Sequence, residues 1–286
     1  MNLKSLLWIS DPHLNFLRYR QTGHDNDTLL KKVFTPLASG PKGVGVLLTG
    51  DISESNHLVH DLLRVVKHLT PEVPIFYILG NHDFYRGSLE GTRKMLVEDP
   101  TLGLVHNLHY LTVKDPLDLG NGVVLTGHDG LYDCRAGFAE NSNLLMSDFQ
   151  LIGELRRYYA GPQHMSLIGF VRQKSMEFAL EAKESILKAV AMNPKKVLFA
   201  THYPPFTGAC WHRGAISDGN WLPWFTSLSM GEVLAEVAFE NPGIQFEVYC
   251  GHTHSSGVYK HLPNLVVYTA SAEYGEIHAK RVEVTP

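Results

Sequence analysis

The sequence has few cysteines, no long apolar run and no block of like charge. Its 286 residues include three cysteines, which are widely spaced and form no Cys-x-x-Cys pair. This spacing argues against a disulfide framework and fits a reducing compartment. No apolar run approaches the length of a membrane span. We therefore expect a cytoplasmic protein that does not associate with membranes.

Positive charge is also scarce. The formal net charge is -4, and the 25 lysine and arginine residues are scattered along the chain without a basic run. Binding to extended nucleic acid depends on neutralising many phosphates, so this charge disfavours such a partner. We expect a small substrate instead, and the oligomeric state stays open.

Histidine, by contrast, is abundant. The chain has 16 histidines, and at that frequency chance alone produces roughly one His-x-His pair, so a single pair carries no meaning. Apolar residues make up 44% of the sequence, which is enough for one large α/β domain or two small ones. Only an ordered set of motifs can indicate a function.

Five apolar runs end in short polar segments. An apolar run closed by glycine or polar residues predicts a buried strand followed by a functional loop. Helical spacing of apolar residues at 57–69, 171–192 and 229–239 gives an alternation typical of parallel strands with crossover helices. Such sheets bind ligands beyond the carboxyl ends of their strands. The runs are 3–9, 44–48, 75–79, 197–200 and 246–250, and they are followed by Asp11, His13, Asp51, Asn81, His82, Asp83, His202, His252 and His254.

The alternation breaks down in the middle of the chain. Residues 133–166 show little apolar periodicity of their own, and we interpret them as a partly helical insertion or cap. Strands are expected again at 265–269 and 277–284. We therefore predict a single domain over residues 1–286 with this insertion.

The residue types at the strand ends favour a metal site. Imidazole nitrogens together with carboxylate or amide oxygens suit Mn, Fe, Zn, Ni or Co better than Mg or Ca, which prefer oxygen ligands. These candidates are too many for one catalytic ion with open positions. Two ions that share a carboxylate use them well.

The motifs occur in the order Asp11-Pro-His13, Gly50-Asp51, Gly80-Asn81-His82-Asp83, His202 and Gly251-His252-Thr-His254. This ordered set resembles the signature of the calcineurin-like metallophosphoesterase superfamily, and the resemblance covers residues 11–254. It implies a four-layer α/β/β/α sandwich of two mixed β-sheets flanked by helices. It also implies a dinuclear metal-dependent phosphohydrolase, in which a hydroxide bridging the metals attacks phosphorus in line.

The resemblance also implies a role for each residue. His82 would protonate the leaving oxygen or stabilise the transition state, and Asp83 could orient it. Two divalent ions, two carboxylates and one hydroxide would leave a formal charge of about +1, which attracts phosphate. One metal would be held by Asp11, His13, Asp51 and His254, and the other by Asp51, Asn81, His202 and His252, with Asp51 as the bridge.

Residues on the substrate side are less distinctive. The segment 203–228 holds three of the four tryptophans, whose rings could stack on a flat leaving group or only pin the loop. Trp211 is the aromatic candidate for substrate binding. Arg86 and Arg213 are candidates for holding a phosphate oxygen, although exposed arginines without such a role are common.

Several functions are compatible with these motifs. A phosphodiesterase acting on a small organic or nucleotide diester is our first interpretation, because residues 201–205 and 251–254 look closer to the cyclic-nucleotide phosphodiesterase-like branch than to the protein phosphatases. The alternative enzyme is a phosphomonoesterase, including a protein Ser/Thr phosphatase. From another class, the alternative is a non-catalytic metal-binding scaffold. Manganese is the first ion to test.

Overall fold

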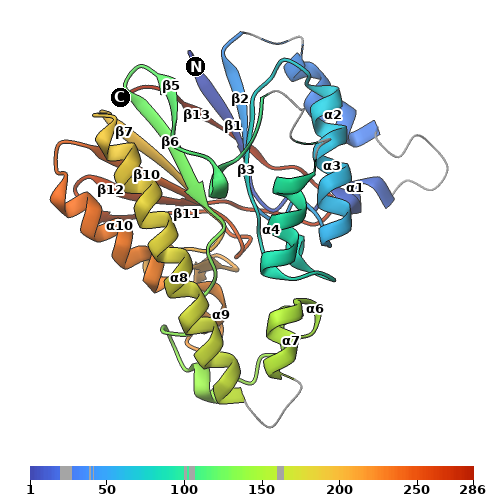
Figure 1. The fold of residues 1–286 in the computed structure, drawn as a ribbon, viewed down its shortest axis with the longest axis vertical. Helices are drawn as coiled ribbons and strands as arrows, with labels where there is room; N and C mark the ends of the chain where they lie inside the picture. The colour runs from blue at the N-terminus through green and yellow to red at the C-terminus, as the bar shows by residue number, and fades with distance from the viewer. Residues whose placement is uncertain (20–27, 39, 41, 100–101, 103–106, 160–163) are drawn as a thin grey trace.

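Two β-sheets pack face to face in the computed structural model, which describes residues 1–19, 28–38, 40, 42–99, 102, 107–159 and 164–286 (Figure 1). Both sheets are mixed, because one edge strand of the first sheet and both edge strands of the second run antiparallel to their neighbours, while the other strands pair in parallel. In spatial order the first sheet contains β13 (Ala279–Glu283), β1 (Ser5–Ile9), β2 (Val44–Thr49), β3 (Ile75–Ile78) and β4 (Leu108–Tyr110). The second contains β11 (Gly257–Leu262), β12 (Leu265–Thr269), β10 (Gln245–Cys250), β7 (Lys196–Thr201), β6 (Val123–His128) and β5 (Leu117–Gly120).

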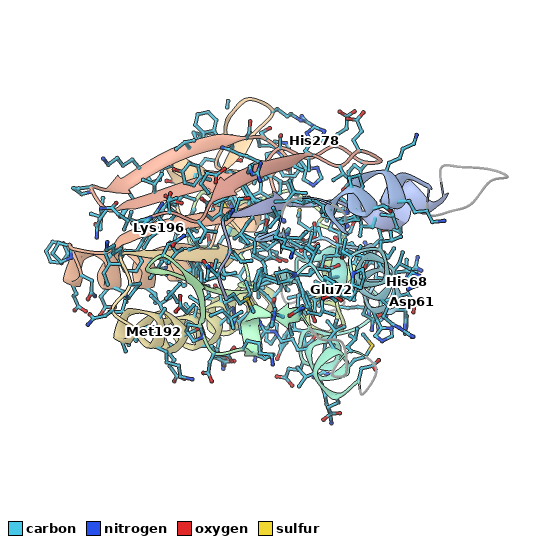
Figure 2. All side chains as sticks on the ribbon, turned by 90° about the horizontal axis from the view of Figure 1, so that it is seen from above. Asp61, His68, Glu72, Met192, Lys196 and His278 are labelled. Atoms are coloured by element: carbon cyan, nitrogen blue, oxygen red, sulfur yellow. The ribbon has the colours of Figure 1, made fainter. Side chains whose placement is uncertain are left out.

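Helices cover the outer face of each sheet (Figure 1). The first sheet packs against α1, α2 and α3, and the second packs against α8 and α10. Asp61 and His68 lie at the outer edge of the molecule, on the exposed face of α3 (Figure 2). The helices are α1 (Leu14–Tyr19), α2 (Thr28–Ala38), α3 (Asn56–Leu69), α4 (Leu89–Glu98), α6 (Asp148–Leu151), α7 (Gly153–Tyr159), α8 (His164–Ala191), α9 (Leu222–Phe225) and α10 (Leu228–Glu240).

Alternation along the strands builds these four layers. Successive side chains of a strand point to opposite faces, so in β2 the side chain of Leu47 enters the core between the sheets. Its neighbours Val46 and Leu48 face the helices instead. Leu198 on β7 meets Leu47 in the same inter-sheet core. The predicted four-layer α/β/β/α sandwich is confirmed.

One long helix begins well before the residue that we predicted for its start. Helix α8 begins at His164, seven residues before the expected start, because Gly169 and the preceding residues carry no clear helical signal. Its first turn therefore lies within the segment that we interpreted as an insertion. Helix α4 begins at Leu89, since the Ser88 hydroxyl accepts a hydrogen bond from Gly91 N and caps the helix. Among the described residues, none of the helices has the length and apolarity needed to cross a membrane.

A buried carboxylate links the end of β3 to the second sheet. Asp129 follows β6 and accepts hydrogen bonds from Leu79 N (2.7 Å) and Thr112 Oγ1 (2.7 Å) with one oxygen. Its other oxygen accepts from Tyr110 Oη (2.5 Å) and Arg93 Nε (2.9 Å). Because Leu79 directly precedes Gly80, this carboxylate fixes the loop that carries Asn81 and His82.

We predict that Asp129→Leu lowers the free energy of unfolding by about 3–5 kcal/mol, because it leaves the Arg93 guanidinium without its main partner in a largely buried position. Urea denaturation in excess chelator measures this loss without any metal contribution. The double variant Asp129→Leu, Arg93→Leu should recover part of it. A loss below about 1 kcal/mol would contradict the anchoring role.

Candidate metal centre

The seven side chains that we expected to bind metal meet at the carboxyl ends of five strands. Their ligand atoms form two groups, and within each group the carboxylate and imidazole atoms lie within 4.8 Å of one another. Asn81 completes the second group, because its Oδ1 lies 3.1 Å from His202 Nε2 and 3.0 Å from His252 Nδ1. The first group is Asp11, His13, Asp51 and His254, and the second group is Asp51, Asn81, His202 and His252.

The backbone turns sharply where these strands end. Five of the seven residues have a left-handed backbone, a conformation that non-glycine residues rarely adopt and that concentrates at functional sites. Gly50 is also left-handed, and a Cβ there would collide with the His202 ring. The five φ angles are Asp11 49°, His13 39°, Asp51 50°, His252 68° and His254 57°.

Backbone carbonyls fix which imidazole nitrogens face inward. His202 Nδ1 lies 3.0 Å from the carbonyl oxygen of Thr49, and His252 Nε2 lies 3.1 Å from that of Trp224. Since a carbonyl only accepts hydrogen bonds, these nitrogens carry the proton of each neutral imidazole, and neutral His202 and His252 present the lone pairs of Nε2 and Nδ1 to the centre. The donor set therefore fits a divalent metal ion.

The electrostatics of the centre also require a cation. Burial opposes ionisation of Asp51, yet His202, His82 and His13 hold the pKa of its carboxyl well below the usual range. Burial likewise opposes a charge on His202, but Asp51 and Asp11 raise its pKa to about 10. Buried carboxylates that attract protons onto neighbouring imidazoles will attract a metal ion in their place.

His82 lies beside the groups and not within them. Its backbone N donates to Asp51 Oδ1 (2.9 Å), and its Nδ1 lies 2.8 Å from Glu54 Oε1. Burial lowers the pKa of His82, but Asp51 and Glu54 outweigh burial and raise it to about 9. The imidazole is therefore protonated near neutral pH and can donate a proton.

Glu54, which we did not single out from the sequence, makes the contact with His82 that we expected of Asp83. Its Oε1 also lies 2.7 Å from His13 Nδ1, and the two imidazoles outweigh burial and lower the pKa of Glu54 to about 2. Asp83 instead accepts hydrogen bonds from the backbone N atoms of Ile52, Ser53 and Gly80, which fastens two loops together. The only feature of the sequence that points to Glu54 is its position three residues after the predicted metal ligand Asp51.

The substrate candidates lie outside the two groups. Arg86 and Arg213 are exposed, and Arg86 has a left-handed backbone (φ 62°). Trp211, on the short hairpin of β8 (Trp211–His212) and β9 (Ala215–Ile216), packs so closely on Gly257 that a Cβ there would collide with its ring. The next residue, His212, contacts the backbone between His252 and His254 instead, with Nδ1 3.2 Å from the carbonyl oxygen of Thr253.

Two aromatic surfaces flank the centre at different places. The hairpin surface consists of the half-buried rings of His212 and Trp221, which pack on the buried ring of Phe225, and the Phe225 ring lies 5.0 Å from that of His252. The C-terminal surface consists of Phe16 and Tyr274, and the Tyr274 ring lies 4.5 Å from that of His13 in the first group and 5.3 Å from that of His254. Each group of ligands therefore has its own aromatic neighbour.

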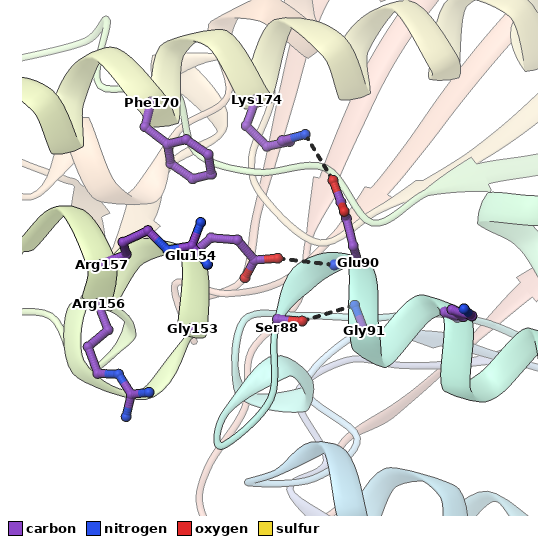
Figure 3. Close-up of a pocket in the computed structure, with 10 residues that line it drawn as sticks. Ser88, Glu90, Gly91, Gly153, Glu154, Arg156, Arg157, Phe170 and Lys174 are labelled. Atoms are coloured by element: carbon purple, nitrogen blue, oxygen red, sulfur yellow. Dashed lines mark hydrogen bonds and ion pairs between the residues drawn. The ribbon is translucent and has the colours of Figure 1, made fainter.

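A separate cavity of about 920 Å³ lies between α4, α7 and α8 (Figure 3). Lys174 forms an ion pair there with Glu90 (3.5 Å). None of the residues lining this cavity belongs to either group of ligands. This cavity is thus distinct from the metal centre.

Comparisons with known proteins agree with the motifs. The model of the calcineurin-like phosphoesterase family matches residues 4–256. A phosphopantetheinyl hydrolase from Mycobacterium tuberculosis has a similar structure, with a TM-score of 0.60 at 14% identity, over 96% of this chain and 92% of that one. A dimetal phosphatase from Danio rerio follows at a TM-score of 0.51 and 13% identity, over 95% of this chain and 88% of that one. Comparison with curated proteins finds no match.

We predict that metal binding releases protons. In the metal-free protein His202 has a pKa of about 10 and is protonated near neutral pH, whereas a metal ion requires the neutral imidazole. Affinity should therefore rise with pH below that value, with on the order of one proton released per chain. Titration calorimetry in buffers of different ionisation enthalpy measures the release. A binding heat that does not depend on the buffer would refute it.

Proposed function

Because the chain belongs to the calcineurin-like phosphoesterase family, we propose that it is a phosphodiesterase for small organic or nucleotide diesters. It is a metal-dependent phosphoesterase, a hydrolase that acts on phosphoric ester bonds with two divalent metal ions. We propose that the first group of ligands holds one ion and the second group the other. When bound, the two ions lower the pKa of water and offset the charge of the phosphate.

The two aromatic surfaces are the observation that carries the diester proposal. A diester has two organic groups on phosphorus, one that leaves and one that stays, whereas a monoester has only the group that leaves. The C-terminal surface adjoins His13, and the hairpin surface adjoins His252. Aromatic rings bind flat or apolar groups well. One such surface beside each group of ligands supports a substrate with two organic substituents.

His82 supports the departure of the leaving group. Its ring lies 4.9 Å from that of His13, and its Nε2 lies 3.8 Å from Asp51 Oδ2, so it borders the space shared by the two groups. A protonated imidazole in this position can give its proton to the leaving oxygen. The Glu54 carboxylate holds the opposite nitrogen of that ring and favours the protonated form.

We predict that the protein loaded with Mn²⁺ hydrolyses a chromogenic phosphodiester faster than the matching monoester. We further predict that His82→Ala lowers the diester kcat by ~10²–10⁴-fold while it retains both metal ions, because His82 serves proton transfer and not coordination. Both rates and the metal content are measured on the same samples.

The exposed His57 on α3 offers a matched control, and His57→Ala should leave both rates unchanged. Activity confined to the monoester would replace the proposal with a phosphomonoesterase. A fully loaded wild type that is inert towards both esters would instead indicate a binding scaffold.

We also predict that Glu54→Gln lowers the diester kcat by ~10–100-fold, because the neutral amide no longer favours a protonated His82. In a His82→Ala background the same change should have little further effect, since residues that act as a unit are not additive. Kinetics of the two single variants and the double variant test this. Multiplicative losses would show that Glu54 acts through His13 instead.

A further inference from the structure

The inserted part of the chain runs alongside the loop of the second group. Residues 148–154, which we call the bracing segment, contact residues 81–90 in the same chain direction, and Gly87 and Ile152 form a parallel bridge. The hydrogen bonds, in chain order, pair Asn81 and Tyr85 with Asp148, Arg86 with Leu151, Gly87 with Gly153, and Leu89 and Glu90 with Glu154.

Asp148 lies at the inner end of this segment, against the metal centre. Asn81 Nδ2 donates to Asp148 Oδ1 at 2.9 Å, and Tyr85 Oη donates to the same oxygen at 2.6 Å. Asn81 Nδ2 also lies 3.2 Å from Tyr85 Oη. Asp148 is fully buried. The amide nitrogen of Asn81 therefore faces two oxygen atoms, while its amide oxygen faces the histidines of the second group.

This arrangement decides which end of the amide can bind a metal ion. The oxygen and nitrogen ends of an asparagine side chain have nearly the same shape, but only the oxygen offers lone pairs. A rotation by half a turn would direct the NH₂ group towards the ion. With Asp148 in place, that rotation would set the amide oxygen against a carboxylate oxygen, which is repulsive.

The same carboxylate is costly for the fold. In the described part of the chain, Asp148 Oδ2 has no hydrogen-bond partner although it is buried. A buried polar atom without a partner destabilises a protein by about 1–3 kcal/mol. The stability of the fold alone thus gives no reason for a carboxylate at this position. A role of Asp148 Oδ1 in positioning Asn81 does give one.

We propose that Asp148 is a positioning residue of the second group, which holds the Asn81 amide with its oxygen towards the metal. This inference rests on the assignment of Asn81 as a metal ligand. It makes metal binding depend on a residue that lies 67 positions away in the inserted part of the chain. Docking of the bracing segment and occupancy of the second group then stabilise each other.

The outer end of the same segment offers a matched control. The Glu154 carboxylate accepts a hydrogen bond from Leu89 N (2.9 Å) at the first turn of α4. It also accepts one from Glu90 N (3.3 Å), which Figure 3 shows. It anchors the bracing segment as Asp148 does, but it does not touch the metal ligands. A loss caused by weaker docking alone should therefore appear in Glu154→Ala as well.

The experiment is a titration of metal-free protein with Mn²⁺, followed by calorimetry and by metal content after dialysis. In Asp148→Ala we expect one ion to bind as in the wild type and the other to bind ~10–100-fold more weakly. Asp148→Asn keeps an acceptor oxygen for Asn81 and should bind both ions at close to wild-type affinity, as should Glu154→Ala. Asp148→Leu keeps the buried volume and serves if the alanine variant does not fold.

Three results would overturn the proposal. The first is wild-type affinity for both ions in Asp148→Ala and Asp148→Leu. The second is an equal loss of metal affinity in Glu154→Ala, which would show that the effect comes only from weaker docking of the bracing segment. The third is an equal loss of metal affinity in Asp148→Asn, which would show that the negative charge of Asp148, and not its acceptor oxygen, is responsible. No substrate is used, so a failure of diester hydrolysis leaves this test unaffected.

Discussion

The Asp51 carboxylate is the group on which the two halves of the metal centre depend. One oxygen accepts from His82 N and lies 3.4 Å from His202 Nε2, while the other lies 4.0 Å from His13 Nε2. It is buried, and a buried carboxylate is stable only where cations or donors surround it. His202 and His82 supply that surrounding in the metal-free protein, because Asp51 raises the pKa of both imidazoles and favours their protonated forms. Divalent ions resolve the conflict, because they satisfy the carboxylates and the imidazole lone pairs together.

The fold can bring these groups together because both sheets end at the same edge. Parallel strands of the first sheet deliver Asp11, Asp51 and Asn81, and those of the second deliver His202 and His252. The left-handed residues and the close approach at Gly50 are consequences of packing so many ligands into one place. The inter-sheet core behind them is apolar, so the strain is balanced by burial elsewhere.

Residues at strand ends could be predicted from the sequence because their position follows from local patterns. An apolar run that stops at Thr49-Gly50-Asp51 fixes both the strand and the end at which its polar residue lies. Glu54 and Asp148 could not be found in this way. Glu54 reaches His13 and His82 only after the loops have folded, and Asp148 meets Asn81 across 67 residues. Interior contacts of this kind depend on tertiary packing. They produce no regular spacing of residue types, so the sequence alone does not predict them.

This difference also bears on how specificity arises in such a site. The ligands at the strand ends define the chemistry, since donor type and charge suit divalent ions and phosphate. The groups that adjust the chemistry come from connecting segments: Glu54 from the loop after β2, Asp148 from the bracing segment, and the hairpin surface from the segment after β7. Loops on a rigid scaffold can change without unfolding the sheets. A common catalytic centre can therefore be combined with different supporting residues, and the substrate is best sought among the contacts that those segments make.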